Sequence, residues 1–149
     1  MKLLLTVLSL GTALLLAPAT WASGGATPDE AKAMAIKAAE YLKSVGPEKA
    51  FAAFDAKDNT EWHDRDLYVT VQDSKGTMVA HGTNPGLIGK SMLNLKDVDG
   101  KPFNQEIQAI KDTAWVEYKW QDPLTKAVGA KTAYEIRVGD YIVGVGAYK

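Results

Sequence analysis

The feature that most constrains the fold is a change in the spacing of apolar residues partway along the chain. Between residues 31 and 45 they recur at helical spacing and form one stripe, made of Ala31, Met34, Ala35, Ala38, Tyr41, Leu42 and Val45. From residue 67 onward they alternate with polar residues instead, as side chains do on a strand. This change of period predicts a helical N-terminal part followed by a sheet.

Short capping and helix-breaking motifs mark the ends of the predicted helices. Thr27-Pro28-Asp29-Glu30 supplies an N-cap, a proline for the first turn and a capping-box glutamate, so a helix begins here. Gly46-Pro47 ends it. A short second helix begins at Pro47 and carries three residues on its inner side, namely Ala50, Phe51 and Phe54.

The rest of the chain predicts five antiparallel strands. A hairpin joins residues 67–72 to residues 77–81, and later strands cover about 114–120, 131–138 and 141–148, the last two joined by a turn at Gly139-Asp140. Between the second and third strands lie a loop rich in glycine and proline and one helix beginning near Phe103. The fold class is therefore α+β: an N-terminal helix and a short second helix packed on a five-stranded, PAS-like antiparallel sheet with one inserted helix.

The N-terminus has the layout of a secretory signal peptide. An apolar stretch from Leu3 to Pro18 follows a lysine and precedes small residues around Ala22. Polar residues interrupt this stretch, and it is shorter than the ~20 residues that span a membrane, which is the alternative reading. We predict cleavage near Ala22, so that residues 1–22 are the signal peptide and residues 23–149 form one exported, periplasmic domain.

Composition argues against several classes of function. The sequence has no cysteine, which excludes a disulfide framework, a thiol nucleophile and covalently attached haem. Its formal net charge of −1 offers no basic excess for nucleic acid. The two histidines, His63 and His81, belong to no cluster with metal-ligand spacing, and neither a Ser-His-Asp order nor a phosphate-binding glycine loop is present. We therefore expect no metal, no cofactor and no enzymatic activity.

Four motifs follow one another from residue 66 to the end of the chain. They are DLYVTVQDSKGTMVAHGTNPGLIGKSMLNLKDVDGKPFNQEI, WVEYKW-x-DP, K-x-x-Y and VGDYIVGVGAYK. Their order and spacing closely resemble the single Cache domain, type 2. Similar domains are the extracellular sensors of chemoreceptors and histidine kinases and bind organic acids of two or three carbons, and similar stand-alone exported forms exist. The resemblance implies a stand-alone sensory module of this kind, with a role like that of a chemotaxis sensor in signal transduction.

The resemblance also implies a ligand pocket between the sheet and the loop that follows the second strand. Tyr118, Trp120 and Tyr134 would line it with aromatic surface, with ordinary core packing as the alternative. A buried carboxylate needs a charge partner, and Lys131, together with tyrosine hydroxyls, is the preferred one. The alternative for Lys131 is a solvated side chain, because alternation along the strand separates it from Tyr134.

Two further residues are candidates for the same pocket. Arg65 matches a family position just before the first strand and could clamp a ligand, although we favour a structural ion pair with neighbouring acids. His81 ends the second strand, where it could donate to a carboxylate or respond to pH, although a structural hydrogen bond is the favoured role.

Two functions are consistent with these features. The first is a periplasmic module that binds a small carboxylate and reports its presence, and it predicts stabilisation by the ligand. The second is an exported interaction protein that has kept the fold without a ligand and docks on a membrane sensor or another periplasmic partner. The sequence leaves open the identity of the acid, the downstream partner and a homodimer through the first helix.

Overall fold

The computed structural model describes residues 24–149, and the predicted signal peptide lies outside the described residues. Helix α1 spans Pro28–Val45 and begins at the expected capping box. The Thr27 hydroxyl accepts from the backbone N–H of Glu30 at 3.3 Å, and the Glu30 carboxylate accepts from the N–H of Thr27 at 2.7 Å. Gly46, at φ 82°, ends α1 and leads directly into α2, Pro47–Asp55.

The sheet has six antiparallel strands, in the order β1-β2-β6-β5-β4, with β3 also paired to β2. The structure confirms the predicted α+β class, and it has one strand more than the five that the sequence predicted. The additional strand has only two residues, too few for a pattern of alternation, and is held by its pairing with β2. The strands are β1 (His63–Asp64), β2 (Leu67–Asp73), β3 (Met78–His81), β4 (Thr113–Gln121), β5 (Val128–Val138) and β6 (Tyr141–Tyr148).

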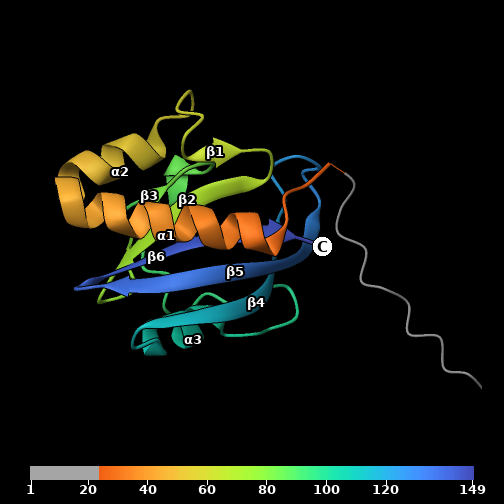
Figure 1. Ribbon diagram of the computed structural model, residues 1–149. Coiled ribbons are helices and arrows are strands. Elements are labelled where there is room, and N and C mark those ends of the chain that lie inside the picture. Colours follow the sequence, from red (N-terminus) through yellow and green to blue (C-terminus); the bar gives the residue numbers. More distant parts are fainter. Residues whose placement is uncertain (1–23) are drawn as a thin grey trace, which may run out of the picture.

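Helix α1 covers one face of the sheet, where it crosses β5 and β6 (Figure 1). Ala31, Ala35 and Ala38 are fully buried there, because their small side chains let the helix approach the strands closely. The strands meet this stripe with valines, which are Val69, Val71, Val143 and Val145. Burial of this apolar face is the main force that holds the helix on the sheet.

The opposite face is covered by the loop that follows β3 and by α3, Phe103–Ala109. A short 3-10 turn, η1 (Pro85–Leu87), lies within this loop. Phe103 and Ile107 of α3 pack with Val116 of β4 and Ile142 of β6 in a second apolar cluster. Polar side chains are also buried on this face, so it differs in chemistry from the face under α1.

No helix within residues 24–149 is both long enough and apolar enough to cross a membrane.

Candidate functional site

Alternation along β5 decides which side chains reach the α3 face of the sheet. Tyr134 and Ile136 belong to the cluster under α1, whereas Lys131 and Glu135 line a cavity on the opposite face. The cavity also contacts β2, β3, β4 and α3, and its other polar lining includes Tyr68, Tyr118 and His81. About 20 Å³ is open to the centre of a water molecule, which is room for about one water.

Lys131 is a buried cation surrounded by tyrosines. It is 3% exposed, and its Nζ donates to the Tyr68 hydroxyl at 2.9 Å. The same Nζ lies 4.1 Å from the ring centroid of Tyr68, 5.2 Å from that of Tyr148 and 5.8 Å from that of Tyr118. Among the described residues no carboxylate forms an ion pair with it. The direct contacts that stabilise the positive charge are therefore aromatic rings and one hydroxyl, and the Glu135 carboxyl acts on it only from beyond ion-pair distance.

Glu135 is the second buried charged residue of the cavity and was not predicted from the sequence. It is 3% exposed, and its carboxyl group has no hydrogen bond to any described residue. Burial raises the pKa of this carboxyl to about 7, and the nearby Lys131 charge opposes that rise only in part. The group therefore titrates close to neutral pH.

Two glycines of β6 make room for these side chains. A Cβ at Gly144 would overlap the carboxyl group of Glu135, and a Cβ at Gly146 would overlap the alkyl chain of Lys131. Both charged side chains therefore lie flat over the backbone of the neighbouring strand. The alternating glycines in VGVGAY, which face alternate residues of β5, were the signal in the sequence that pointed to this arrangement.

His81 ends β3 at the edge of the cavity, and its hydrogen bonds fix its neutral form. Its Nδ1 accepts from the backbone N–H of Asn84 at 3.0 Å and lies 3.4 Å from the N–H of Thr83. The ring stacks on Tyr68 with centroids 5.0 Å apart. Burial first and the Lys131 charge second lower the pKa of His81 to about 3, so the ring is neutral at physiological pH and holds the start of the loop.

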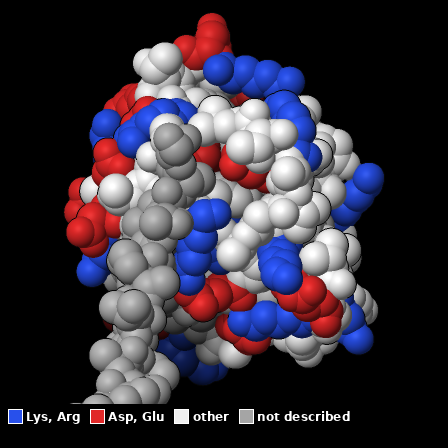
Figure 2. All heavy atoms as spheres, turned by 90° about the vertical axis from the view of Figure 1, so that its right-hand side faces the viewer, with Lys and Arg blue, Asp and Glu red and all other residues white. Residues whose placement is uncertain are grey.

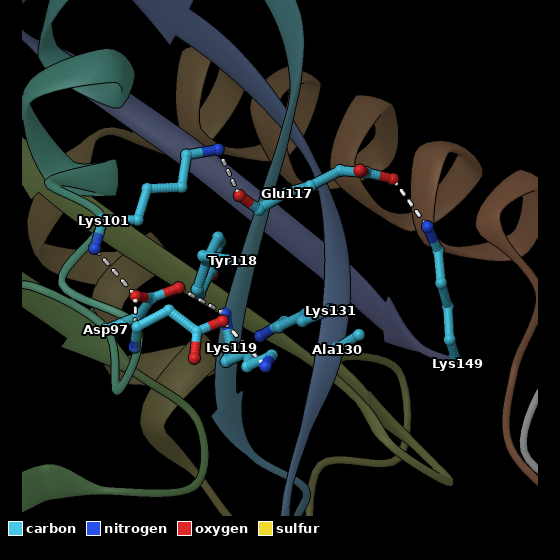
Figure 3. A pocket seen from close by; sticks show the side chains of 9 residues that line it. Asp97, Lys101, Glu117, Tyr118, Lys119, Ala130, Lys131 and Lys149 are labelled. Atoms are coloured by element: carbon cyan, nitrogen blue, oxygen red, sulfur yellow. Dashed lines mark hydrogen bonds and ion pairs between the residues drawn. The ribbon is translucent and has the colours of Figure 1, made fainter.

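An open cleft of about 330 Å³ lies outside the cavity (Figure 3). Tyr118 and Lys131 line both spaces, so they form the wall between them. Two ion pairs form among the residues around the cleft, Lys119 with Asp99 and Lys149 with Glu117, each at 2.7 Å. Side chains of both signs are interspersed on the face of the molecule shown in Figure 2. The cleft therefore gives a polar approach to Lys131 without strong charge of one sign.

Not all of the candidates predicted from the sequence lie together. Tyr118 and Trp120 line the cavity, and Tyr118 stacks on Phe103 with centroids 4.1 Å apart. Tyr134 lies on the α1 face, where its ring is 4.9 Å from that of Trp115 and 5.1 Å from Lys32 Nζ. The structure thus separates it from the other two aromatic residues, because it is three positions from Lys131 on an alternating strand.

Arg65 lies at the surface, away from the cavity. Its guanidinium group forms ion pairs with Glu30 at 2.7 Å and with Asp64 at 2.8 Å. The neighbouring Asp66 is buried and accepts from the backbone N–H groups of Ala26 and Tyr148 at 2.6 and 3.1 Å. These contacts fasten the start of α1 to the end of β6.

A sheet with a long helix on one face and a cavity enclosed by a loop and a short helix on the other defines a PAS-like sensor fold. The model of the Single Cache domain 2 family matches residues 17–149, and the chain belongs to this family. It is a sensory domain of the Cache type, as the order of its motifs predicted.

The proteins that this chain is similar to include chemotaxis proteins. The chain is 30% identical over 91 residues to methyl-accepting chemotaxis protein McpP of Pseudomonas putida, a match that covers 58% of this chain and only 17% of that protein. A methyl-accepting chemotaxis protein of Vibrio parahaemolyticus has a similar structure, with a TM-score of 0.65 and 22% identity over 80% of this chain and 86% of that one. A Cache chemosensory domain whose structure is described as the basis for carboxylic acid recognition is also similar. Its TM-score is 0.67, and it is 22% identical over 80% of this chain and 91% of that one. These two structures support the fold.

Proposed function

We propose that this chain is a periplasmic sensory module that binds a small carboxylate of two or three carbons in the cavity on the α3 face. The buried Lys131 ammonium, which has no ion-pair partner among the described residues, is the observation that carries the proposal. An unpaired buried charge is costly, and a ligand carboxylate would supply the missing partner. A similar Cache domain is described as recognising carboxylic acids, and the predicted signal peptide supports the location.

The proposed pose follows from the donors around Lys131. The ligand carboxylate accepts from Lys131 Nζ and from the Tyr68 hydroxyl, and the ring of Tyr118 closes the site toward the cleft. Because the cavity has room for only about one water, the aromatic lining must move apart when the acid enters. Ligand binding is then coupled to a change in the loop and α3, which is how occupancy would reach a partner.

Thermal unfolding of the purified protein with acetate, propionate, lactate and pyruvate tests this proposal. A ligand at a hundredfold its dissociation constant adds about 2.7 kcal/mol to the free energy of unfolding. We expect a clear shift with at least one acid, lost in Lys131→Met and reduced in Tyr68→Phe. Lys90→Met, at an exposed lysine, and Tyr134→Phe, on the α1 face, are the matched controls and should keep the shift.

The small size of the cavity favours the second candidate function, an interaction protein without a ligand. An interaction protein with this fold would bind a membrane sensor or another periplasmic partner and would need no open pocket. No shift with any acid in the wild-type protein would contradict the sensor and favour this function. Capture of a partner that is unaffected by added carboxylates would then be the result to expect.

A further inference from the structure

The buried carboxyl group of Glu135 is not explained by binding of an anion, because a second negative group would repel the ligand carboxylate. It lines the cavity, is 3% exposed and has no hydrogen bond to any described residue. Gln72 also lines the cavity, but its amide group donates to Asn104 at 2.7 Å and not to Glu135. The Glu135 oxygens open onto the cavity, because Trp62 Nε1 is the only fully enclosed side-chain polar atom without a partner among the described residues. A ligand that displaces water from the cavity must therefore offer these oxygens a donor in its place.

Glu135 and Lys131 give the cavity two different ends. They lie four residues apart on the same face of β5, over Gly144 and Gly146 of β6. The ammonium group at one end donates, while the carboxyl group at the other end, when ionised, only accepts. The two do not reach ion-pair distance of each other. A molecule with an acceptor at one end and a donor at the other matches both ends.

We propose that Glu135 is a specificity-determining residue, which selects small acids that carry a hydrogen-bond donor, either a hydroxyl or an ammonium group, beside the carboxylate. This inference rests on the proposed function, since it places the ligand carboxylate at Lys131. The donor on the neighbouring carbon then faces Glu135. A ligand with a methyl group at that position leaves the Glu135 oxygens unpaired and is bound more weakly.

Propionate, glycolate and glycine test the inference because they share one heavy-atom skeleton. They differ in the terminal group, which is methyl, hydroxyl or ammonium. Calorimetric titration of the wild-type protein at pH 8 should give glycolate or glycine an affinity roughly tenfold or more above that of propionate. Preference for glycine identifies an ammonium group as the donor, and preference for glycolate identifies a hydroxyl group.

Variants of Glu135 separate selection from structure. Glu135→Met offers no acceptor and should remove the preference, because propionate gains affinity while the donor-bearing acid loses it. Glu135→Gln keeps an oxygen acceptor without charge, so it should retain binding of glycolate and weaken that of glycine. Glu48→Met, at an exposed glutamate of α2, is the control and should bind all three as the wild-type protein does.

The outcomes distinguish this inference from the proposed function. Equal affinity of the wild-type protein for propionate, glycolate and glycine would overturn the role of Glu135 and leave a carboxylate site standing. An equal loss of all three in Glu135→Met would also overturn it, since the residue would then act on the fold alone. Absence of binding by every acid in the wider panel would overturn the proposed function itself.

Discussion

Glu135 on β5 and Gly144 on β6 are cross-strand partners, and the carboxyl group of Glu135 fills the space that a side chain at position 144 would need. Lys131 reaches Gly146 diagonally, since its own cross-strand partner is Tyr148, and its alkyl chain fills the space that a Cβ at position 146 would need. The two charged side chains can be buried on the sheet because the strand beneath them carries no side chain at these positions. Burial of these two charged side chains thus depends on both β5 and β6.

Gly144→Ala should therefore destabilise the protein, because the new methyl group displaces the Glu135 carboxyl. We expect a loss of about 1–3 kcal/mol in the free energy of unfolding, measured by urea denaturation. Gly129→Ala, on β5, is the matched control, since its Cβ would meet the Tyr148 ring at an ordinary 3.5 Å. The double variant Gly144→Ala/Glu135→Ala should recover most of the loss. Equal losses for the two single glycine variants would contradict the overlap.

The raised pKa of Glu135 predicts how stability depends on pH. The pKa of this carboxyl is about 7 in the folded protein against an ordinary 4.5, so between these values the folded state holds more protons than the unfolded state. The favourable contribution of the protonated group is complete below about pH 4.5 and is lost as the pH rises through about 7. Glu135→Gln should remove this loss and gain up to about 3 kcal/mol relative to the wild-type protein above pH 7.

Denaturation of both proteins from pH 4 to pH 8 measures the effect. Charged and titratable groups that share the cavity with Glu135 are Lys131 on β5, His81 on β3, Tyr68 on β2 and Tyr118 on β4. Because these groups are present in both proteins, the difference between the two curves isolates Glu135. A difference that stays constant with pH would show that the carboxyl does not titrate in this range.

Local signals in the sequence were sufficient for most of the fold. The capping box at Thr27 and the apolar stripe that follows it predicted α1, because both depend only on neighbouring residues. The short strand β1 was missed, since nothing but its pairing with β2 forms it. Elements specified by local chemistry can be predicted in this way, whereas elements specified only by a distant partner cannot.

The site was harder to predict because it depends on the register and start of strands. Nothing in the sequence marked the start of β5 at Val128, so the faces of Lys131 and Tyr134 stayed undecided. The register between β5 and β6 could have been predicted from the sequence. The two-residue turn pairs Val138 with Tyr141, and counting outward from this pair places Glu135 opposite Gly144. The alternating glycines of β6 were therefore the signal for a pair of buried charges.

His81 should act in the opposite direction to Glu135 when the pH falls. Its pKa is about 3 in the folded protein against an ordinary 6.5, so the unfolded state binds the proton more readily. Its contribution is complete above pH 6.5 and is lost as the pH falls toward 3, by up to about 1.4 kcal/mol per pH unit. Protonation of Nδ1 also breaks the hydrogen bond from the Asn84 N–H.

Comparison with His81→Gln over the same range measures this effect. Asp55 accepts from the backbone N–H of His81, and the other charged or titratable groups that share its cavity are Lys131, Glu135, Tyr68 and Tyr118. The advantage of the wild-type protein over the variant should shrink as the pH drops from 6.5 to 4. An advantage that does not change with pH would mean that the ring keeps its ordinary pKa.

Arg65→Ala should leave ligand binding unchanged and cost little stability. Its side chain is 36% exposed, and exposed ion pairs contribute little to stability and weaken with salt. Arg65 also has a positive φ of 56°, so Arg65→Gly should be at least as stable as Arg65→Ala, since glycine adopts this conformation without strain. Urea denaturation at low and high salt measures the first effect, and the carboxylate titration measures binding. A large loss of affinity in Arg65→Ala, equal to that in Lys131→Met, would place the ligand near the start of α1 and not over β5.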